Sequence, residues 1–323
     1  MKTLLITGGL GFIGSAFTNY MVEKYPEWNF VNLDAEYYCA NHDNITVSDK
    51  SNYHYVKGSV QNEELVSYVL AMHQIDTVIH FAAQSHVDQS FCTPLQHTRD
   101  NTLGTHVLLE CCRLYSGIKL FIHCSTDEVF GESSDGEVKT NTSILLPTNP
   151  YAASKAAAEM FVTSYIKSFN LPIVVTRGNN VIGPRQYKEK LIPKFIEFLR
   201  NNEKCTIHGN GKMLRSFIYI DDVVRAFETV LLKGVIGETY NIGIREEYSV
   251  IDVANKLIQM IKGDDVNPDD WITYVQDRNF NDCRYLIDTS ELEALGWKCK
   301  TKFDDSLKII VDQYKHINES NGK

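Results

Sequence analysis

The first 180 residues alternate short apolar runs with longer segments whose apolar positions recur at helical spacing. The short runs favour β structure and predict buried strands at 3–8, 29–34, 53–58, 77–82, 119–125 and 172–178. Helical patterns lie between several of these strands, at 12–25, 101–115 and 151–169. Strands that alternate with helices at this spacing predict an α/β fold built on a doubly wound parallel sheet.

After residue 180 the pattern is less regular and predicts a second, smaller C-terminal lobe. We expect helices at 191–202, 222–234, 249–262 and 306–317, and β segments at 205–209 and 238–243. Residues 222–245 combine a helix and a strand that we expect to return to the main sheet. The predicted main domain is therefore 1–180, and the lobe comprises 181–221 and 246–323.

Composition and charge narrow the class of protein. The chain has 323 residues, of which 43% are hydrophobic and 23% charged, as in ordinary globular proteins. A net charge of −9 argues against nucleic acid or an anionic membrane as the main partner. Apolar runs stay short of the roughly 20 residues of a membrane span, and the N-terminal MKTLLITGG is too short and glycine-rich for a signal peptide. Eight scattered cysteines, none in a CxxC pair or at zinc-ligand spacing, indicate no metal site and favour a reducing cytoplasm.

The first predicted strand runs directly into the glycine-rich sequence TGGLGFIG. Residues 9–14 fit G-x-G-x-x-G, and Gly8, Gly11 and Gly14 also fit G-x-x-G-x-x-G. Glycines permit a tight turn at the start of a helix, whose N–H groups then approach a pyrophosphate. Asp34 ends the next strand, where a carboxylate accepts hydrogen bonds from a ribose diol and repels a 2′-phosphate. These positions predict a Rossmann domain that binds NAD rather than NADP; the alternative is a structural glycine turn.

Two further patterns suggest acid–base chemistry. Tyr151 and Lys155 stand at i, i+4 on one face of a predicted helix, and a lysine beside a phenol lowers the phenol's pKa. Tyr151 is then a candidate base for a hydroxyl proton, although the same spacing also occurs in ordinary amphipathic helices. Thr126, Asp127 and Glu128 follow a predicted buried strand, where two crowded carboxylates oppose each other's ionisation. They form either a solvated acidic loop or an acid–base pair at the carboxyl edge of the sheet.

Eight short motifs stand in a characteristic order: TGGLGFIG, HFAAQSHVD, STDEVFG, NPYAASK, RGNNVIGP, EKLIPKF, RSFIYIDDV and YNIG. This series, over nearly the whole chain, resembles the extended short-chain dehydrogenase/reductase family and, within it, the nucleotide-sugar 4,6-dehydratases. Its most specific part is Thr126-Asp127-Glu128, because related sugar epimerases and decarboxylases usually lack the Asp-Glu pair. The resemblance implies an NAD-dependent lyase. In such an enzyme Tyr151 takes the proton of the sugar 4-hydroxyl, Glu128 takes the C5 proton, and Asp127 protonates the departing 6-hydroxyl.

The same resemblance implies the other contacts of the site. Thr126 hydrogen-bonds the O4 region of the sugar, and Lys155 assists Tyr151. The implied cofactor contacts are Gly8, Gly11, Phe12, Ile13, Gly14, Asp34, Ser59, Val60, Phe81, Ala82, Ala83, Tyr151 and Lys155. The implied substrate contacts are Ser85, Thr126, Asn180, Lys190, Leu191, Arg215 and Arg278. The two arginines are expected near the diphosphate and the nucleoside, because a guanidinium matches phosphate geometry.

Several positions depart from the bacterial dTDP-glucose dehydratases. Gln84 replaces a Glu, Ser59 replaces an Asp beside the adenine, Phe130 replaces a Tyr, and residues 177–181 read RGNNV. Most of these differences resemble the UDP-glucose 4,6-dehydratase domain of plant-type rhamnose synthases. We therefore expect UDP-glucose as the substrate, with dTDP-glucose as the alternative. A 4-epimerase or decarboxylase would leave the two carboxylates without a role, and a non-catalytic NAD-binding scaffold commonly loses the Tyr or the Lys.

The helices predicted at 101–115 and 151–169 carry apolar residues on more than one face. These residues include Val107, Leu108, Met160, Phe161 and Tyr165. One face can pack on the sheet while another joins a second copy of the chain in a four-helix interface. We therefore predict a homodimer; the alternative is a pair of helices fully covered within one chain.

Overall fold

The computed structural model of the protein describes residues 2–277 and 282–321. Its centre is a parallel sheet of seven strands in the order β11-β6-β5-β4-β1-β2-β3, which confirms the predicted α/β fold. The six strands expected before residue 180 are all present. The strands are β1 (Thr3–Thr7), β2 (Asn29–Asp34), β3 (Tyr53–Lys57), β4 (Thr77–His80), β5 (Leu120–Thr126), β6 (Ile173–Gly178) and β11 (Thr239–Ile242).

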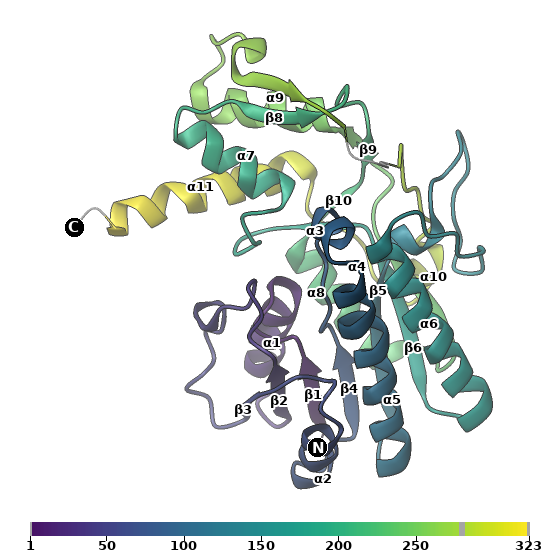
Figure 1. Cartoon of the computed structure of the whole chain (residues 1–323). Helices are drawn as coiled ribbons and strands as arrows, with labels where there is room; N and C mark the ends of the chain where they lie inside the picture. The colour runs from purple at the N-terminus through teal and green to yellow at the C-terminus, as the bar shows by residue number, and fades with distance from the viewer. Residues whose placement is uncertain (1, 278–281, 322–323) are drawn as a thin grey trace.

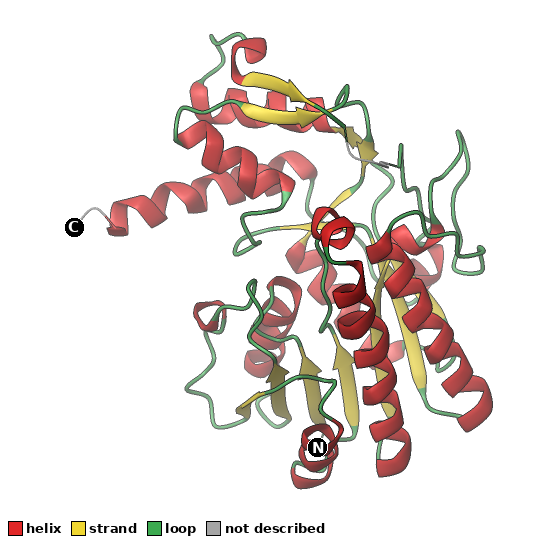
Figure 2. Cartoon of the chain, in the orientation of Figure 1, coloured by secondary structure: helices red, strands yellow, loops and turns green. Residues whose placement is uncertain are grey.

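Helices cover both faces of this sheet, as Figures 1 and 2 show. Because side chains alternate along a strand, Leu4 and Ile6 pack into the core on one face and Leu5 into the core on the other. Helices α1 (Phe12–Lys24) and α8 (Ile220–Lys233) pack against each other on the first face. The second face is covered by α2 (Glu63–Met72), α5 (Gly104–Tyr115) and α6 (Pro150–Phe169).

The segment before α5 differs from the helix expected at 101–115. Residues Thr98–Leu103 form a π-helical segment that runs into α5 at Gly104. Two short helices, α3 (Val87–Cys92) and α4 (Pro94–His97), precede this segment. The expected helix therefore starts earlier and with wider turns than simple helical periodicity predicts.

The C-terminal lobe lies above the sheet in Figure 1 and has a separate hydrophobic core. Helices α7, α9 and α11 and a parallel pair of strands, β8 and β13, build this core. Two smaller strand pairs, β7–β10 and β9–β12, complete the lobe and its connection to the main domain. The bounds are β7 (Asn180–Ile182), α7 (Leu191–Arg200), β8 (Cys205–His208), β9 (Leu214–Arg215), β10 (Phe217–Tyr219), β12 (Tyr248–Ser249), α9 (Val250–Lys262), β13 (Ile272–Val275) and α11 (Phe303–Asn321).

The chain crosses between the main domain and the C-terminal lobe more often than the boundaries predicted from the sequence imply. Helix α8 and strand β11 return to the main domain, as expected for 222–245. Helix α10 (Ser290–Ala294) also packs against β11, and Leu292 and Trp297 join the core that contains α1 and α8. Part of the segment 246–323 therefore belongs to the main domain rather than to the lobe. The physical reason is that β11 is an edge strand whose outer side needs cover.

Two observations bear on the expected surroundings of the protein. Among the described residues, no helix combines the length and apolar character that crossing a membrane requires. All eight cysteines are free thiols. The cytoplasmic location itself stays a prediction.

Candidate active site

The glycine-rich turn between β1 and α1 forms a tight backbone cradle. Gly8 has φ +72°, in the left-handed region that favours glycine. A Cβ on Gly8 would lie 2.7 Å from the Ala82 backbone, and a Cβ on Gly14 would lie 2.3 Å from the carbonyl oxygen of Gly8. Gly11 occupies the N-cap of α1 and has no side chain to compete for the first N–H groups of the helix. The cradle therefore fits the G-x-x-G-x-x-G spacing and suits a pyrophosphate at the helix N-terminus.

Asp34 stands at the end of β2, directly beside this cradle. Its Oδ2 accepts the N–H of Leu10 at 2.9 Å, and its Oδ1 accepts the N–H of Glu36 at 2.8 Å. Burial raises the pKa of the Asp34 carboxyl group, and these two backbone bonds oppose that rise. The carboxylate is thus fixed at the position where we expect an adenosine ribose, a role that stays a prediction.

A single cavity of about 470 Å³ runs from the glycine cradle past the carboxyl ends of β1, β4, β5 and β6 to the lobe. It brings together every predicted site residue that the structure describes; Arg278 lies outside the described residues. On the cofactor side these are Gly8, Gly11, Phe12, Ile13, Gly14, Asp34, Ser59, Val60, Phe81, Ala82 and Ala83. On the substrate side they are Ser85, Thr126, Asp127, Glu128, Tyr151, Lys155, Asn180, Lys190, Leu191 and Arg215. Their proximity supports the predicted roles, which themselves stay predictions.

The two carboxyl groups lie in the short 3-10 turn η3 (Asp127–Phe130), which directly follows β5. Thr126 Oγ1 donates a hydrogen bond to Asp127 Oδ1 at 3.2 Å and accepts the N–H of Glu128 at 3.3 Å. Asp127 is only 3% exposed, and burial raises its pKa to about 7, with the charge of Glu128 adding to the rise. Burial also raises the pKa of Glu128. Asp127 is therefore partly protonated near neutral pH and is suited to act as an acid.

Tyr151 and Lys155 project from the first turns of α6 into the same cavity. The Lys155 ammonium donates a hydrogen bond to the carbonyl oxygen of Cys124 in β5 at 2.7 Å. Burial, followed by the charge of Glu128, raises the pKa of the Tyr151 phenol well above its usual value. Burial therefore dominates the pKa of Tyr151, and the lowering effect expected of Lys155 stays a prediction. One of the three N–H groups of Lys155 is bound to β5, and the phenol is buried near the carboxyl groups of Glu128 and Asp127.

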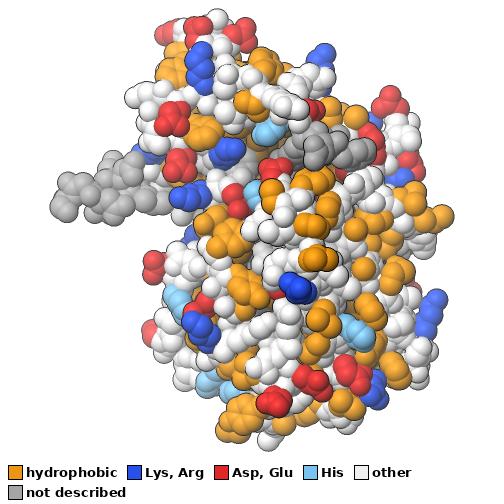
Figure 3. Space-filling model, in the orientation of Figure 1, with side chains coloured by type: hydrophobic (Ala, Val, Ile, Leu, Met, Phe, Trp, Pro, Cys, Tyr) orange, Lys and Arg blue, Asp and Glu red, His pale blue; other side chains and the backbone are white. Residues whose placement is uncertain are grey.

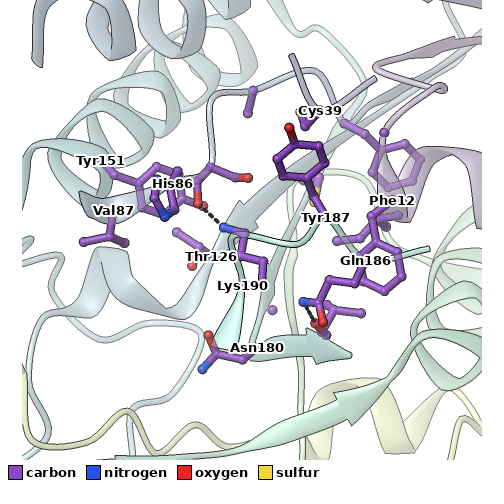
Figure 4. Close-up of a pocket in the computed structure, with 18 of the residues that line it drawn as sticks. Phe12, Cys39, His86, Val87, Thr126, Tyr151, Asn180, Gln186, Tyr187 and Lys190 are labelled. Carbon is purple, nitrogen blue, oxygen red and sulfur yellow. Dashed lines mark hydrogen bonds between the residues drawn. The ribbon is translucent and has the colours of Figure 1, made fainter. Parts of the chain in front are cut away.

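Lys190 and Arg215 approach the cavity from the lobe side. Lys190 Nζ donates to the carbonyl oxygen of Ser85 at 2.6 Å, the dashed contact beside Thr126 and Tyr151 in Figure 4. The Arg215 guanidinium lies 4.9 Å from the ring centre of Tyr285. These two cations face the carboxyl groups at the end of the cavity where a diphosphate is expected.

Two asparagines that the motifs alone did not single out contact the acids directly. Asn179 Nδ2 donates to Asp127 Oδ2 at 2.7 Å. Asn149 Nδ2 donates to Glu128 Oε2 at 3.0 Å. Both asparagines stand inside quoted motifs, RGNN and NPY, so their positions were visible even though their partners were not.

The two histidines near the end of β4 differ in their surroundings. Because neither has a partner at metal-ligand spacing in the sequence, both are predicted to have structural roles. His80 is buried and bridges two hydroxyls, with Nδ1 2.7 Å from Thr7 Oγ1 and Nε2 2.9 Å from Thr105 Oγ1, which fits a structural role. His86 lines the cavity beside Tyr151 (Figure 4), with its ring nitrogens 3.8 Å from a Glu189 oxygen and 3.9 Å from an Asp88 oxygen. Over the part of the chain that the structure describes, no group of three or more His, Cys, Asp or Glu residues is placed to hold a metal ion.

Comparison with known proteins connects this arrangement to one family. The sequence profile of the GDP-mannose 4,6 dehydratase family matches residues 5–310. The trifunctional UDP-glucose 4,6-dehydratase/UDP-4-keto-6-deoxy-D-glucose 3,5-epimerase/UDP-4-keto-L-rhamnose-reductase of Arabidopsis thaliana is 47% identical over 316 residues. That alignment covers 97% of this chain but 47% of the plant protein, so the chain spans about half the length of this relative.

Two further relatives match over most of their length. The dTDP-D-glucose 4,6-dehydratase of Mus musculus is 46% identical over 317 residues, which are 97% of this chain and 89% of that protein. The dTDP-glucose 4,6-dehydratase of Streptomyces venezuelae, crystallised with NAD and TYD bound, superposes with a TM-score of 0.92 at 33% identity. That superposition covers 97% of both chains.

Proposed function

The chain belongs to the GDP-mannose 4,6-dehydratase family, among its NAD-dependent nucleotide-sugar 4,6-dehydratases, and we propose that it converts UDP-glucose to UDP-4-keto-6-deoxyglucose. The observation that carries the proposal is the meeting of Asp127 and Glu128 with Tyr151 in the cavity that contains the glycine cradle. A 4-epimerase on the same scaffold has no need for two carboxyl groups there. A pKa of about 7 at Asp127 supports its use as the acid of an elimination.

The proposed reaction divides the proton transfers among three side chains. NAD, when bound, supplies a hydride acceptor for C4 and a hydride donor for C6. In its ionised form, which its raised pKa makes a strong base, Tyr151 takes the proton of the 4-hydroxyl, and the 4-ketone then makes the C5 proton acidic. Glu128 takes the C5 proton while Asp127 gives its proton to O6, so that the C6–O bond breaks, a C5–C6 double bond forms and water leaves. Glu128 then returns a proton to C5, and Tyr151 and Asp127 regain their starting states through solvent.

The choice of UDP-glucose rests on the similarity of particular positions to the plant enzymes. Gln84 and the run RGNNV at 177–181 resemble the dehydratase part of plant rhamnose synthases. The named activities of the Arabidopsis relative include steps that consume a UDP-4-keto-6-deoxy sugar. We therefore also propose that the product enters the synthesis of a 6-deoxysugar such as rhamnose.

The test supplies the protein with NAD⁺ and either UDP-glucose or dTDP-glucose, and follows product mass and absorbance at 340 nm. Loss of one water without accumulation of NADH supports the dehydratase, and the faster substrate identifies the preferred nucleotide. Conversion to a galactose isomer of unchanged mass would instead indicate an epimerase. The Tyr151→Phe variant is the matched control, because it should lose turnover but keep its affinity for NAD.

We further propose that the protein is a homodimer joined through α5 and α6. Met160 and Phe169 on α6 and Leu114 on α5 are about half exposed or more, whereas Leu108 and Tyr165 pack into the chain's own core. Hydrophobic side chains lie over this part of the face in Figure 3. A second copy would cover them. Light scattering should give about twice 36.8 kDa, and a clean monomer mass would contradict the proposal.

A further inference from the structure

Each carboxyl group of the site accepts a hydrogen bond from one asparagine amide. We propose that Asn179 and Asn149 are positioning residues that select the reacting oxygen of each acid. Asn179 engages Oδ2 of Asp127, so that Oδ1, which the rotatable Thr126 hydroxyl contacts at 3.2 Å, is the oxygen that protonates the departing hydroxyl. Asn149 engages Oε2 of Glu128 and leaves Oε1 to take the C5 proton. The inference rests on the proposed dehydratase function and assigns its two proton transfers to single atoms.

The backbone fixes the orientation of both amides. The N–H of Ile244 donates to Asn179 Oδ1 at 3.0 Å, and the N–H of Ala152 donates to Asn149 Oδ1 at 2.8 Å. An amide oxygen cannot donate, so each asparagine must present its NH₂ group, and not its oxygen, to the carboxyl group. A reversed amide would lose the backbone bond and set two oxygens against each other.

Close packing holds Asn179 in this position. The residue is 5% exposed, and a Cβ on Gly243 would lie 2.0 Å from Asn179 Oδ1. Glycine at 243 therefore leaves the space that the amide fills. Asn149 is 7% exposed and also forms the N-cap of α6, the helix that carries Tyr151. The cap thus links the orientation of Glu128 to the start of this helix.

These contacts determine where a proton sits on Asp127. The fixed Asn179 N–H opposes a proton on Oδ2, whereas the Thr126 hydroxyl beside Oδ1 can rotate from donor to acceptor, so we assign the proton to Oδ1. Oδ1 is the oxygen next to Thr126 Oγ1, which lies on the cavity wall. The acidic proton is therefore held on the side of the group that faces Thr126, where we expect the sugar.

The same bonds act on the acidity of both groups. A hydrogen bond from an amide N–H favours the ionised carboxylate, so Asn179 opposes the burial that raises the pKa of Asp127. Asn149 opposes the rise for Glu128 in the same way. Removal of Asn179 should extend the protonated range of the acid to higher pH. Removal of Asn149 should raise the pKa of Glu128, so that this base is ionised only from a higher pH upward.

The experiment measures the two halves of the reaction separately in Asn179→Ser and Asn149→Ser. Serine is too short to reach either carboxyl group, and serine at 149 keeps a good N-cap for α6. Rapid-scan absorbance at 340 nm follows oxidation at C4, and quenched-flow mass spectrometry follows water loss. We expect the rate of oxidation to stay within about twofold of the unchanged protein, and the rate of water loss to fall by about tenfold or more. A positioned proton transfer contributes about 10²–10⁴-fold to a rate, so misplacing the acid or the base loses part of this factor. NADH should therefore accumulate.

The pH profile of water loss gives a readout that a general packing defect would not move. The high-pH limb should shift upward in Asn179→Ser, and the low-pH limb should shift upward in Asn149→Ser. Asn179→Asp preserves the size of the side chain, replaces its N–H donor with a second carboxyl group beside Asp127 and should shift the high-pH limb further upward, so it covers the case in which the serine variant fails to fold. Asn52→Ser is the control: its amide donates to the carbonyl oxygens of Val22, Tyr25 and Trp28, away from the cavity.

The outcomes separate the inference from the function on which it rests. If the unchanged protein forms no NADH and releases no water with either sugar nucleotide, the proposed function fails and the inference falls with it. If the unchanged protein dehydrates but oxidation and water loss fall together in the asparagine variants, the positioning role is wrong. Variants that keep both pH limbs in place would overturn it as well.

Discussion

Replacing the buried acid Asp127 with asparagine should make the protein more stable, and more so as pH rises. Burial moves the pKa of Asp127 from 3.8 to about 7 in the folded chain. The folded state therefore holds this proton more tightly than the unfolded state, and stability falls as pH rises from about 4 to about 7. About three pKa units correspond to a cost of about 4 kcal/mol that is fully present above pH 7. Asparagine cannot ionise, and its carbonyl oxygen can still accept the N–H of Asn179.

Urea unfolding of the unchanged protein and Asp127→Asn, followed by tryptophan fluorescence, measures this difference. We expect the variant to be more stable by up to about 4 kcal/mol at pH 8 and by only about 1.5 kcal/mol at pH 5, where the unfolded aspartate alone is largely ionised. Water loss from the sugar should fall by about 10²-fold or more in the same variant. A stability difference that is the same at both pH values, or a variant less stable at pH 8, would refute the assigned pKa.

Three further results follow from contacts in the structure. Glu159→Leu leaves the buried Arg177 guanidinium without its 2.7 Å partner and should lower the free energy of unfolding by about 3–5 kcal/mol. Adding Arg177→Met to this variant should restore stability. Urea titration of the unchanged protein, both single variants and the double variant measures this, and a loss below about 1 kcal/mol in Glu159→Leu would contradict it. Gly14→Ala places a Cβ 2.3 Å from the carbonyl oxygen of Gly8 and should abolish NAD binding in calorimetry, whereas retained affinity would show that the cradle adjusts. Tyr151→Phe should bind NAD normally yet form no NADH with substrate, and residual oxidation at the original rate would exclude the phenol as the base.

The glycine cradle and the main strands were predictable because each depends on local constraints. A tight turn with positive φ and close backbone approach accepts few residues other than glycine, so the motif identifies the geometry directly. Buried parallel strands are apolar on both sides, which makes them stand out in a chain of amphipathic helices. Helix α10 carries no such signal. Its short length and mixed polarity do not reveal that Leu292 packs on the main domain.

The contact between Asn179 and Asp127 depends on the order of strands rather than on either motif. The two residues are 52 positions apart in the sequence. An asparagine carries no charge and belongs to no periodic pattern, so the sequence alone does not indicate its role. Strands β5 and β6 are neighbours in register, with Thr126 opposite Gly178. The first residue after each strand is then Asp127 for β5 and Asn179 for β6, which brings acid and amide together at the carboxyl edge. The doubly wound strand order therefore predicts this contact, whereas the residue types expected of a catalytic site do not include the asparagine.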